Sequence, residues 1–251
     1  MREIEGWMAD RRTRRRARQA LLWSTLATAA LYFVPFGFWI AYPLTLWSTF
    51  LHELGHGLAA IAVGGQFDQL AIYSDASGVA QYRGVQSEHG RALVAAGGLV
   101  GPPMFAAVAF VAGRRPRSAR VFLGGLAVAL LVLTSLFVRN GFGIAFASVV
   151  VLGLGWVVVR KSADTAQLVL VFLAVQAALS VFSRGDYLFT ATAVTGAGTM
   201  PSDTAQMAAA LGGSYWMWGL ACGAFSVLVI AAGIGWFWRM SKDRPLPPRR
   251  R

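Results

Sequence analysis

Two histidines and a glutamate form the clearest chemical motif in this chain, in the stretch His52-Glu53-Leu54-Gly55-His56. On a helix, positions i and i+4 lie on one face, so both imidazoles can reach a single metal ion. Glu53 follows the first histidine and can contact a metal-bound water as a general base. Zinc suits this arrangement, because it accepts imidazole nitrogen and lowers the pKa of bound water towards ~7. The motif predicts a zinc site with His52 and His56 as ligands and Glu53 as the catalytic base.

The surroundings of the motif strengthen this prediction. The chain has only three histidines, and two of them fall in an apolar run with Glu53 between them. Ionisable side chains inside such a run are costly to insert into a membrane and usually mark function. The alternative is a buried, hydrogen-bonded trio that stabilises helix packing without binding metal.

A catalytic zinc needs a third protein ligand as well as an open position for water. The one cysteine, Cys222, lies in an apolar stretch, so a carboxylate or the remaining histidine must supply the ligand. Asp186 and Asp203 are the favoured candidates, with equal weight, and only one of them is expected to bind. Asp164 and His89 are less favoured.

The composition is typical of a membrane protein. Of 251 residues, 56% are hydrophobic and 14% charged, and the mean hydropathy is +0.55. Soluble domains carry about 25% charged residues. The net charge of +12 is concentrated in two tails, residues 1–18 and 239–251. Basic clusters that flank apolar spans set membrane topology and touch anionic lipids, so we expect no nucleic-acid partner. Residues 19–238 are predicted to form a single membrane-embedded domain, with 1–18 as a cytoplasmic tail.

Apolar runs divide this domain into segments long enough to cross a bilayer as helices. They span about residues 19–34, 39–63, 91–111, 119–138, 142–159, 163–182 and 214–238. The third run contains Gly101-Pro102-Pro103, which predicts a kink or break. The fold class is therefore an all-α polytopic membrane protein with about six to seven transmembrane helices.

Two polar segments separate these runs. In the first, residues 71–73 and 79–82 flank a turn-rich stretch and predict a short β-hairpin after the His-Glu-x-x-His helix. The second, residues 185–213, predicts a loop followed by a short helix. Ser202 or Asp203 could cap that helix, and Gln206 has the spacing of a capping box with Asp203.

The basic segments constrain the topology without deciding it. If the N-terminal tail is cytoplasmic, seven full crossings place the basic C-terminal tail and the loop at residues 114–117 outside, against the positive-inside trend. If the third run is re-entrant, both segments return to the cytoplasm.

Several stretches resemble the M50 peptidases, the site-2-protease-like intramembrane zinc proteases, and most closely their bacterial M50B-like branch. The most specific stretch is residues 50–60, which holds the His-Glu-x-x-His motif; it is followed by Gly64-Gly65, the hairpin and Gly78. Residues 96–102, 140–143 and 202–208 extend the resemblance over about residues 40–238. The resemblance implies zinc ligation by His52 and His56 and catalysis by Glu53. The Leu-Asp-Gly motif that supplies the third ligand in familiar site-2 proteases is absent.

The expected function is zinc-dependent hydrolysis of peptide bonds in or beside the bilayer. Its expected substrates are transmembrane segments of membrane proteins, and its expected location is the bacterial cytoplasmic membrane. The rival interpretation is an inactive relative, or a membrane protein that binds metal or a client helix without catalysis.

Overall fold

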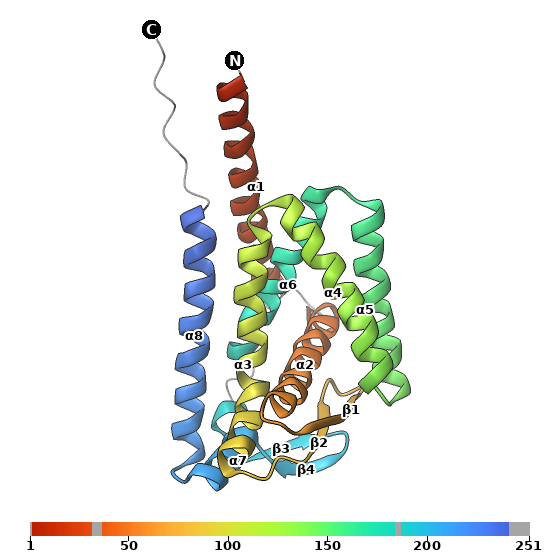
Figure 1. Cartoon of the computed structure of the whole chain (residues 1–251), viewed down its shortest axis with the longest axis vertical. Coiled ribbons are helices and arrows are strands. Elements are labelled where there is room, and N and C mark those ends of the chain that lie inside the picture. The colour runs from red at the N-terminus through yellow and green to blue at the C-terminus, as the bar shows by residue number, and fades with distance from the viewer. Residues whose placement is uncertain (1, 32–36, 184–186, 241–251) are drawn as a thin grey trace.

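The computed structural model describes residues 2–31, 37–183 and 187–240. Within these residues the chain forms eight α-helices and two pairs of strands (Figure 1). The helices are α1 (Arg2–Leu31), α2 (Gly37–Ala62), α3 (Glu88–Gly113), α4 (Pro116–Phe137), α5 (Gly141–Arg160), α6 (Ala163–Ser183), α7 (Asp203–Leu211) and α8 (Tyr215–Met240). The strands are β1 (Gln66–Ile72), β2 (Gly78–Arg83), β3 (Thr192–Thr195) and β4 (Gly198–Pro201), and a 3-10 turn occupies Tyr187–Phe189.

Five of the described helices are long and apolar enough to cross a membrane: α3, α4, α5, α6 and α8. Their outer faces carry large apolar side chains, such as Val121 at 76% and Leu152 at 72% exposure. Apolar faces of this extent are stable against lipid rather than water. The structure is mostly helical, as the predicted all-α membrane class requires, but it has a second pair of strands, and the predicted six to seven spans included the runs that form α1 and α2.

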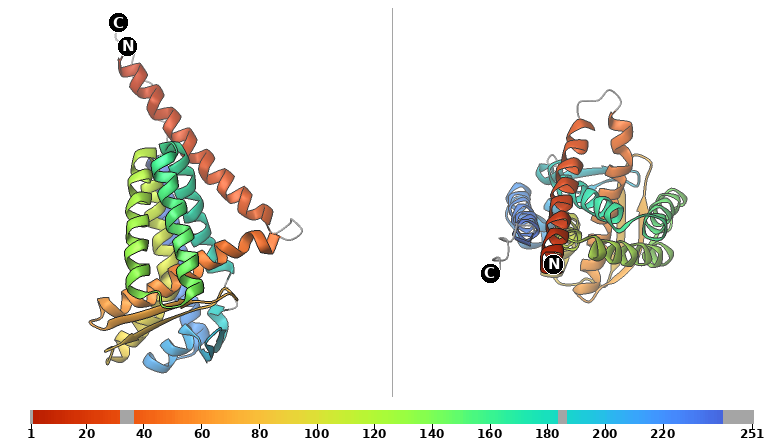
Figure 2. Two further views of the ribbon diagram at one scale, coloured as in Figure 1. Left: turned by 90° about the vertical axis from the view of Figure 1, so that its right-hand side faces the viewer. Right: turned by 90° about the horizontal axis from the view of Figure 1, so that it is seen from above.

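Helices α1 and α2 together lead from one end of the molecule to the other. In Figure 2, α1 descends on a slant from the end that holds both termini, and α2 turns back beneath the bundle towards the strands. Because α2 does not return to the end at which α1 begins, the start of α1 and the end of α8 lie at the same end of the molecule (Figure 1). This arrangement does not require a re-entrant third run, since α3 is one continuous helix.

Of the kink or break predicted in the third run, the break is wrong, because α3 is continuous from Glu88 to Gly113 and contains Pro102 and Pro103. A proline inside a helix loses one hydrogen bond, and its ring crowds the carbonyl four residues earlier. Packing on several sides supports α3 in spite of this loss, since it contacts α2, α6, α7 and α8.

The two β-hairpins lie at the end of the molecule opposite the termini (Figure 1). β1 and β2 pair antiparallel, as do β3 and β4. The hairpins touch at their turns, where the Gly196 amide donates to the Ser77 hydroxyl at 2.8 Å. The β3–β4 hairpin lies within residues 185–213, where the sequence predicts a loop followed by a short helix, so the prediction missed these two strands.

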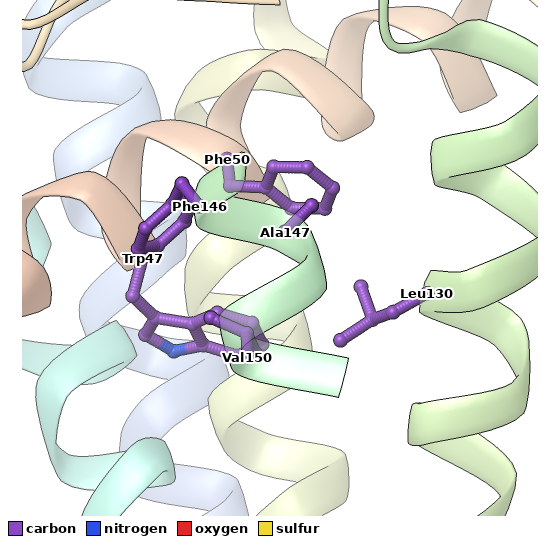
Figure 3. A pocket seen from close by; sticks show the side chains of 6 residues that line it. All are labelled: Trp47, Phe50, Leu130, Phe146, Ala147 and Val150. Atoms are coloured by element: carbon purple, nitrogen blue, oxygen red, sulfur yellow. The ribbon is translucent and has the colours of Figure 1, made fainter. Parts of the chain in front are cut away.

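Helix α2 is anchored in the bundle by aromatic side chains. Figure 3 shows Trp47 and Phe50 of α2 facing Phe146 and Val150 of α5, with Leu130 of α4 beside them. Trp47 and Phe50 are each only 2% exposed. Since Phe50 precedes His52 by two positions, this packing sets how the histidine face of α2 is turned.

Candidate metal centre

Two histidines from α2 and one aspartate from α7 converge on one point. The Nε2 atoms of His52 and His56 lie 3.1 Å apart. Asp203 Oδ2 lies 3.1 Å from His52 Nε2, and Asp203 Oδ1 lies 3.4 Å from His56 Nε2. All three residues are buried, and together they form a group of donors that could hold a metal ion.

The spacing of these donors matches a tetrahedral metal site. A zinc ion with tetrahedral bonds of about 2.0–2.1 Å holds neighbouring donor atoms roughly 3.3 Å apart. The three separations given above, 3.1, 3.1 and 3.4 Å, lie close to that value. Two imidazole nitrogens and a carboxylate oxygen also make a donor set that catalytic zinc uses. The residues therefore fit zinc both in geometry and in chemistry.

A glycine on α3 keeps the space beside the imidazoles open. A Cβ atom added at Gly98 would lie 2.3 Å from His56 Nε2 and 2.9 Å from His52 Nε2. The missing side chain thus leaves room where the two ring nitrogens converge. Any larger residue here would compete with a bound ion or push the imidazoles aside.

Close contact between α2 and α3 brings Gly98 to this position. A Cβ at Gly55 would meet the carbonyl oxygen of Gly97 at 2.2 Å, and one at Gly101 would lie 3.2 Å from the Gly55 Cα. Backbones approach this closely only where side chains are absent. The same contact lets His56 Nδ1 donate to the Val94 carbonyl at 2.8 Å. That hydrogen bond fixes the tautomer and aims Nε2 at the centre.

Asp203 is free to face the histidines because a neighbour caps its helix. Ser202 is the N-cap of α7 and accepts from the Ala205 amide at 3.1 Å. The Gln206 side chain donates to the Pro201 carbonyl, so the predicted capping box between Gln206 and Asp203 is wrong. Among the described residues, Asp203 Oδ2 accepts no hydrogen bond. A buried carboxylate oxygen in that state has the chemistry of a metal ligand.

Charge also favours the ionised form of Asp203. Burial alone would raise the pKa of this carboxyl, but the His56 and His52 imidazoles beside it outweigh burial and hold the pKa well below its usual range. The lowered pKa favours the carboxylate form of Asp203, the form in which it can ligate a cation.

The catalytic candidate Glu53 lies between the metal centre and the first hairpin. Its side chain is buried, and a Cβ added at Gly78, the first residue of β2, would lie 3.0 Å from Glu53 Oε1. One turn earlier on α2, Thr49 donates to the Ala76 carbonyl at 2.7 Å. The β1–β2 turn is thus tied to α2 directly above the glutamate.

The other predicted ligand candidates do not join the donor group in the described part of the chain. Asp164 is exposed at the start of α6 and pairs with Arg16 of α1, in the part of the molecule where the termini lie. His89 is exposed in the first turn of α3 and does not belong to the donor group. Asp186 lies outside the described residues.

Two contributors to the site escaped the sequence prediction. In the sequence, Gly98 is only one member of the stretch 96–102 that resembles the M50 peptidases, and the Val94 carbonyl carries no side-chain signal at all. The run Ala96-Gly97-Gly98 does indicate close helix packing, but a sequence alone does not show which helix approaches it.

We expect Gly98→Ala to lower the zinc content of the purified protein sharply. The new methyl group would overlap His56 Nε2, so it would either displace the ring or fill the metal position. The matched control is Gly153→Ala on α5, where an added Cβ meets nothing within 4 Å. Metal analysis of both variants, with helicity checked by circular dichroism, tests this. Full zinc occupancy in folded Gly98→Ala would contradict the location of the site.

Comparison with known families gives one match. The family model described as Peptidase M50B-like matches residues 23–233. The matched range includes α2, α3 and α7, and so all the residues that converge on the metal centre. No curated protein and no solved structure matches the chain.

Proposed function

The chain belongs to the M50B-like peptidase family, and from this we propose that it is a zinc-dependent intramembrane protease. We assign His52, His56 and Asp203 as the zinc ligands and Glu53 as the catalytic base. The observation that carries the proposal is the convergence of three buried donors at the spacing of a tetrahedral zinc site, with a glutamate next to the first ligand.

In the proposed mechanism, Glu53 handles the proton. Bound zinc would supply a Lewis acid that polarises the scissile carbonyl and makes water acidic. Glu53 accepts a proton from the attacking water at its carboxylate and then delivers it to the nitrogen of the leaving amine. The burial of Glu53 keeps bulk water from that carboxylate during the transfer. The Val94 carbonyl holds His56 in its ligating orientation throughout.

The first hairpin offers an edge for an extended substrate. The outer edge of β1 is occupied, because Arg139 donates its amide to the Leu70 carbonyl and Asn140 makes two hydrogen bonds to the backbone of Ile72. Within the described residues, β2 pairs only with β1. A peptide strand added to β2 would pass Gly78 and therefore Glu53. We propose that a transmembrane segment unwinds and binds along this edge before it is cut.

Zinc content and its removal test the proposed function. The purified protein should hold about one zinc per chain, and His52→Ala/His56→Ala should hold almost none, since a two-histidine-plus-carboxylate centre loses two of three ligands. A membrane-anchored peptide reporter should be cut in proteoliposomes, with cutting lost on chelation and restored by added zinc. Unchanged zinc in the double variant, or cutting that survives complete zinc removal, would refute the proposal.

A further inference from the structure

The end of the molecule at which α1 begins and α8 ends is strongly basic. Its described side chains include one exposed acid, Asp164, and a much larger set of basic residues: Arg15, Arg16, Arg18, Arg114, Arg115, Arg117, Arg120, Arg160, Lys161 and Arg239. Contacts join this set into one surface. Arg16 pairs with Asp164, Arg120 donates to the Lys161 carbonyl, and Arg18 stacks over Trp238. Helix α1, the α3–α4 turn, the α5–α6 turn and the end of α8 thus share one basic rim.

The opposite end has no such excess. Among the described residues, Arg83, Arg91 and Arg139 are exposed there. They are offset by the acids Asp68, Asp75 and Glu88, and Arg83 pairs with Asp68. This end also carries both hairpins, α7 and the metal centre (Figure 1). The excess of basic residues therefore lies at one end of the molecule, and the metal centre lies at the other.

Exposed tryptophans lie close to the basic rim. Trp236 and Trp238 lie near the end of α8, and Trp156 lies near the end of α5, where the Lys161 ammonium stacks over it at 4.3 Å. Tryptophan favours the headgroup level, and short loops rich in lysine and arginine stay in the cytoplasm. Anionic lipids of the cytoplasmic leaflet attract the same residues.

From this charge distribution we infer that the basic rim faces the cytoplasm and that the metal centre opens towards the non-cytoplasmic side of the membrane. This inference rests on the proposed function for its substrate class. The substrates are membrane-anchored proteins whose scissile bond lies at the non-cytoplasmic end of the anchoring segment. Since β2, Gly78 and Glu53 all lie at that end, an anchored chain reaches them from the non-cytoplasmic leaflet without crossing the bilayer.

Cysteine labelling in intact bacteria tests the orientation without any need for activity. In a Cys222→Ala background, single cysteines replace Gln86 or Ser74 at the hairpin end, and Ser162 or Arg117 at the basic rim. All four positions are exposed. A membrane-impermeant maleimide should label Gln86→Cys and Ser74→Cys on intact cells. It should label Ser162→Cys and Arg117→Cys only after permeabilisation. The reverse pattern, or equal labelling of both ends on intact cells, would overturn the orientation.

A paired reporter then tests the substrate class. Two anchored peptides carry the same cleavage sequence, one on the cytoplasmic and one on the non-cytoplasmic side of the anchor. Cutting should be confined to the second reporter, and cutting of the first alone would overturn the inference. If neither is cut while the labelling pattern holds, the proposed protease activity fails and the orientation stands. The Glu53→Gln variant should keep the labelling pattern and lose all cutting.

Discussion

Glu53→Gln should abolish peptide hydrolysis while zinc stays bound. Glutamine keeps the size of the side chain but cannot accept the proton of the attacking water, so the rate should fall by ~10²–10⁴-fold, the usual contribution of a positioned general base. Zinc should remain, because Glu53 is not one of the three converging donors. Cleavage of the anchored reporter and metal content, measured on the same preparation, give both readouts.

The retained zinc makes this result specific to catalysis. A variant that lost both zinc and activity would show only that the site had been disturbed. Glu53→Asp is a useful companion, since it keeps the carboxylate but shortens its reach, and it should recover part of the activity. Wild-type rates in Glu53→Gln would remove Glu53 from the mechanism and favour a protein that holds metal or a client helix without cutting it.

Asp203→Ala should lose zinc and activity together, whereas Asp186→Ala should keep both. Asp203 is buried, ionised and within 3.1–3.4 Å of both imidazole nitrogens. Loss of a direct ligand should weaken zinc binding by more than the ~10–100-fold that follows loss of an outer-shell partner. Competition with a chelator of known affinity measures the change.

These two aspartates form a matched pair, because the sequence favours them equally. If Asp186→Ala loses zinc and Asp203→Ala keeps it, the ligand assignment is reversed. If neither loses zinc, the three-ligand centre is refuted. Stability needs its own check, since removal of Asp203 also leaves two buried imidazoles without their carboxylate. Added zinc should raise the melting temperature of the wild-type protein and leave that of Asp203→Ala unchanged.

The local parts of this fold were accessible from the sequence. The His-Glu-x-x-His spacing places both histidines on one helix face wherever the helix lies, and the apolar runs reproduce α3 to α6 and α8 within a few residues. Both signals depend on neighbours along the chain. A break at Pro102-Pro103, one of the two outcomes predicted there, failed for the opposite reason, because packing of α3 against several other helices outweighs a local preference.

Long-range parts were not accessible. Asp203 has the sequence environment of a helix cap, and only the structure gives that role to Ser202 and turns the aspartate to the histidines. The direction of α2 could not be predicted either. A long apolar run has the same sequence pattern whether its helix crosses the bilayer or slants beneath a bundle. The strands of the β3–β4 hairpin have only four residues each, which is too short for a strand pattern to stand out in the sequence.

The division of the metal donors between α2 and α7 has a consequence for biosynthesis. The ribosome completes the histidine pair early, but the aspartate follows only after α3, α4, α5 and α6 have been made. Until α7 folds onto α3, the nascent chain holds two imidazoles and a glutamate without the carboxylate that closes the donor set. A zinc ion on such an intermediate would have fewer protein ligands and a weaker hold. The three donors that could hold a metal ion are therefore complete only after α7 has been made and has folded onto α3.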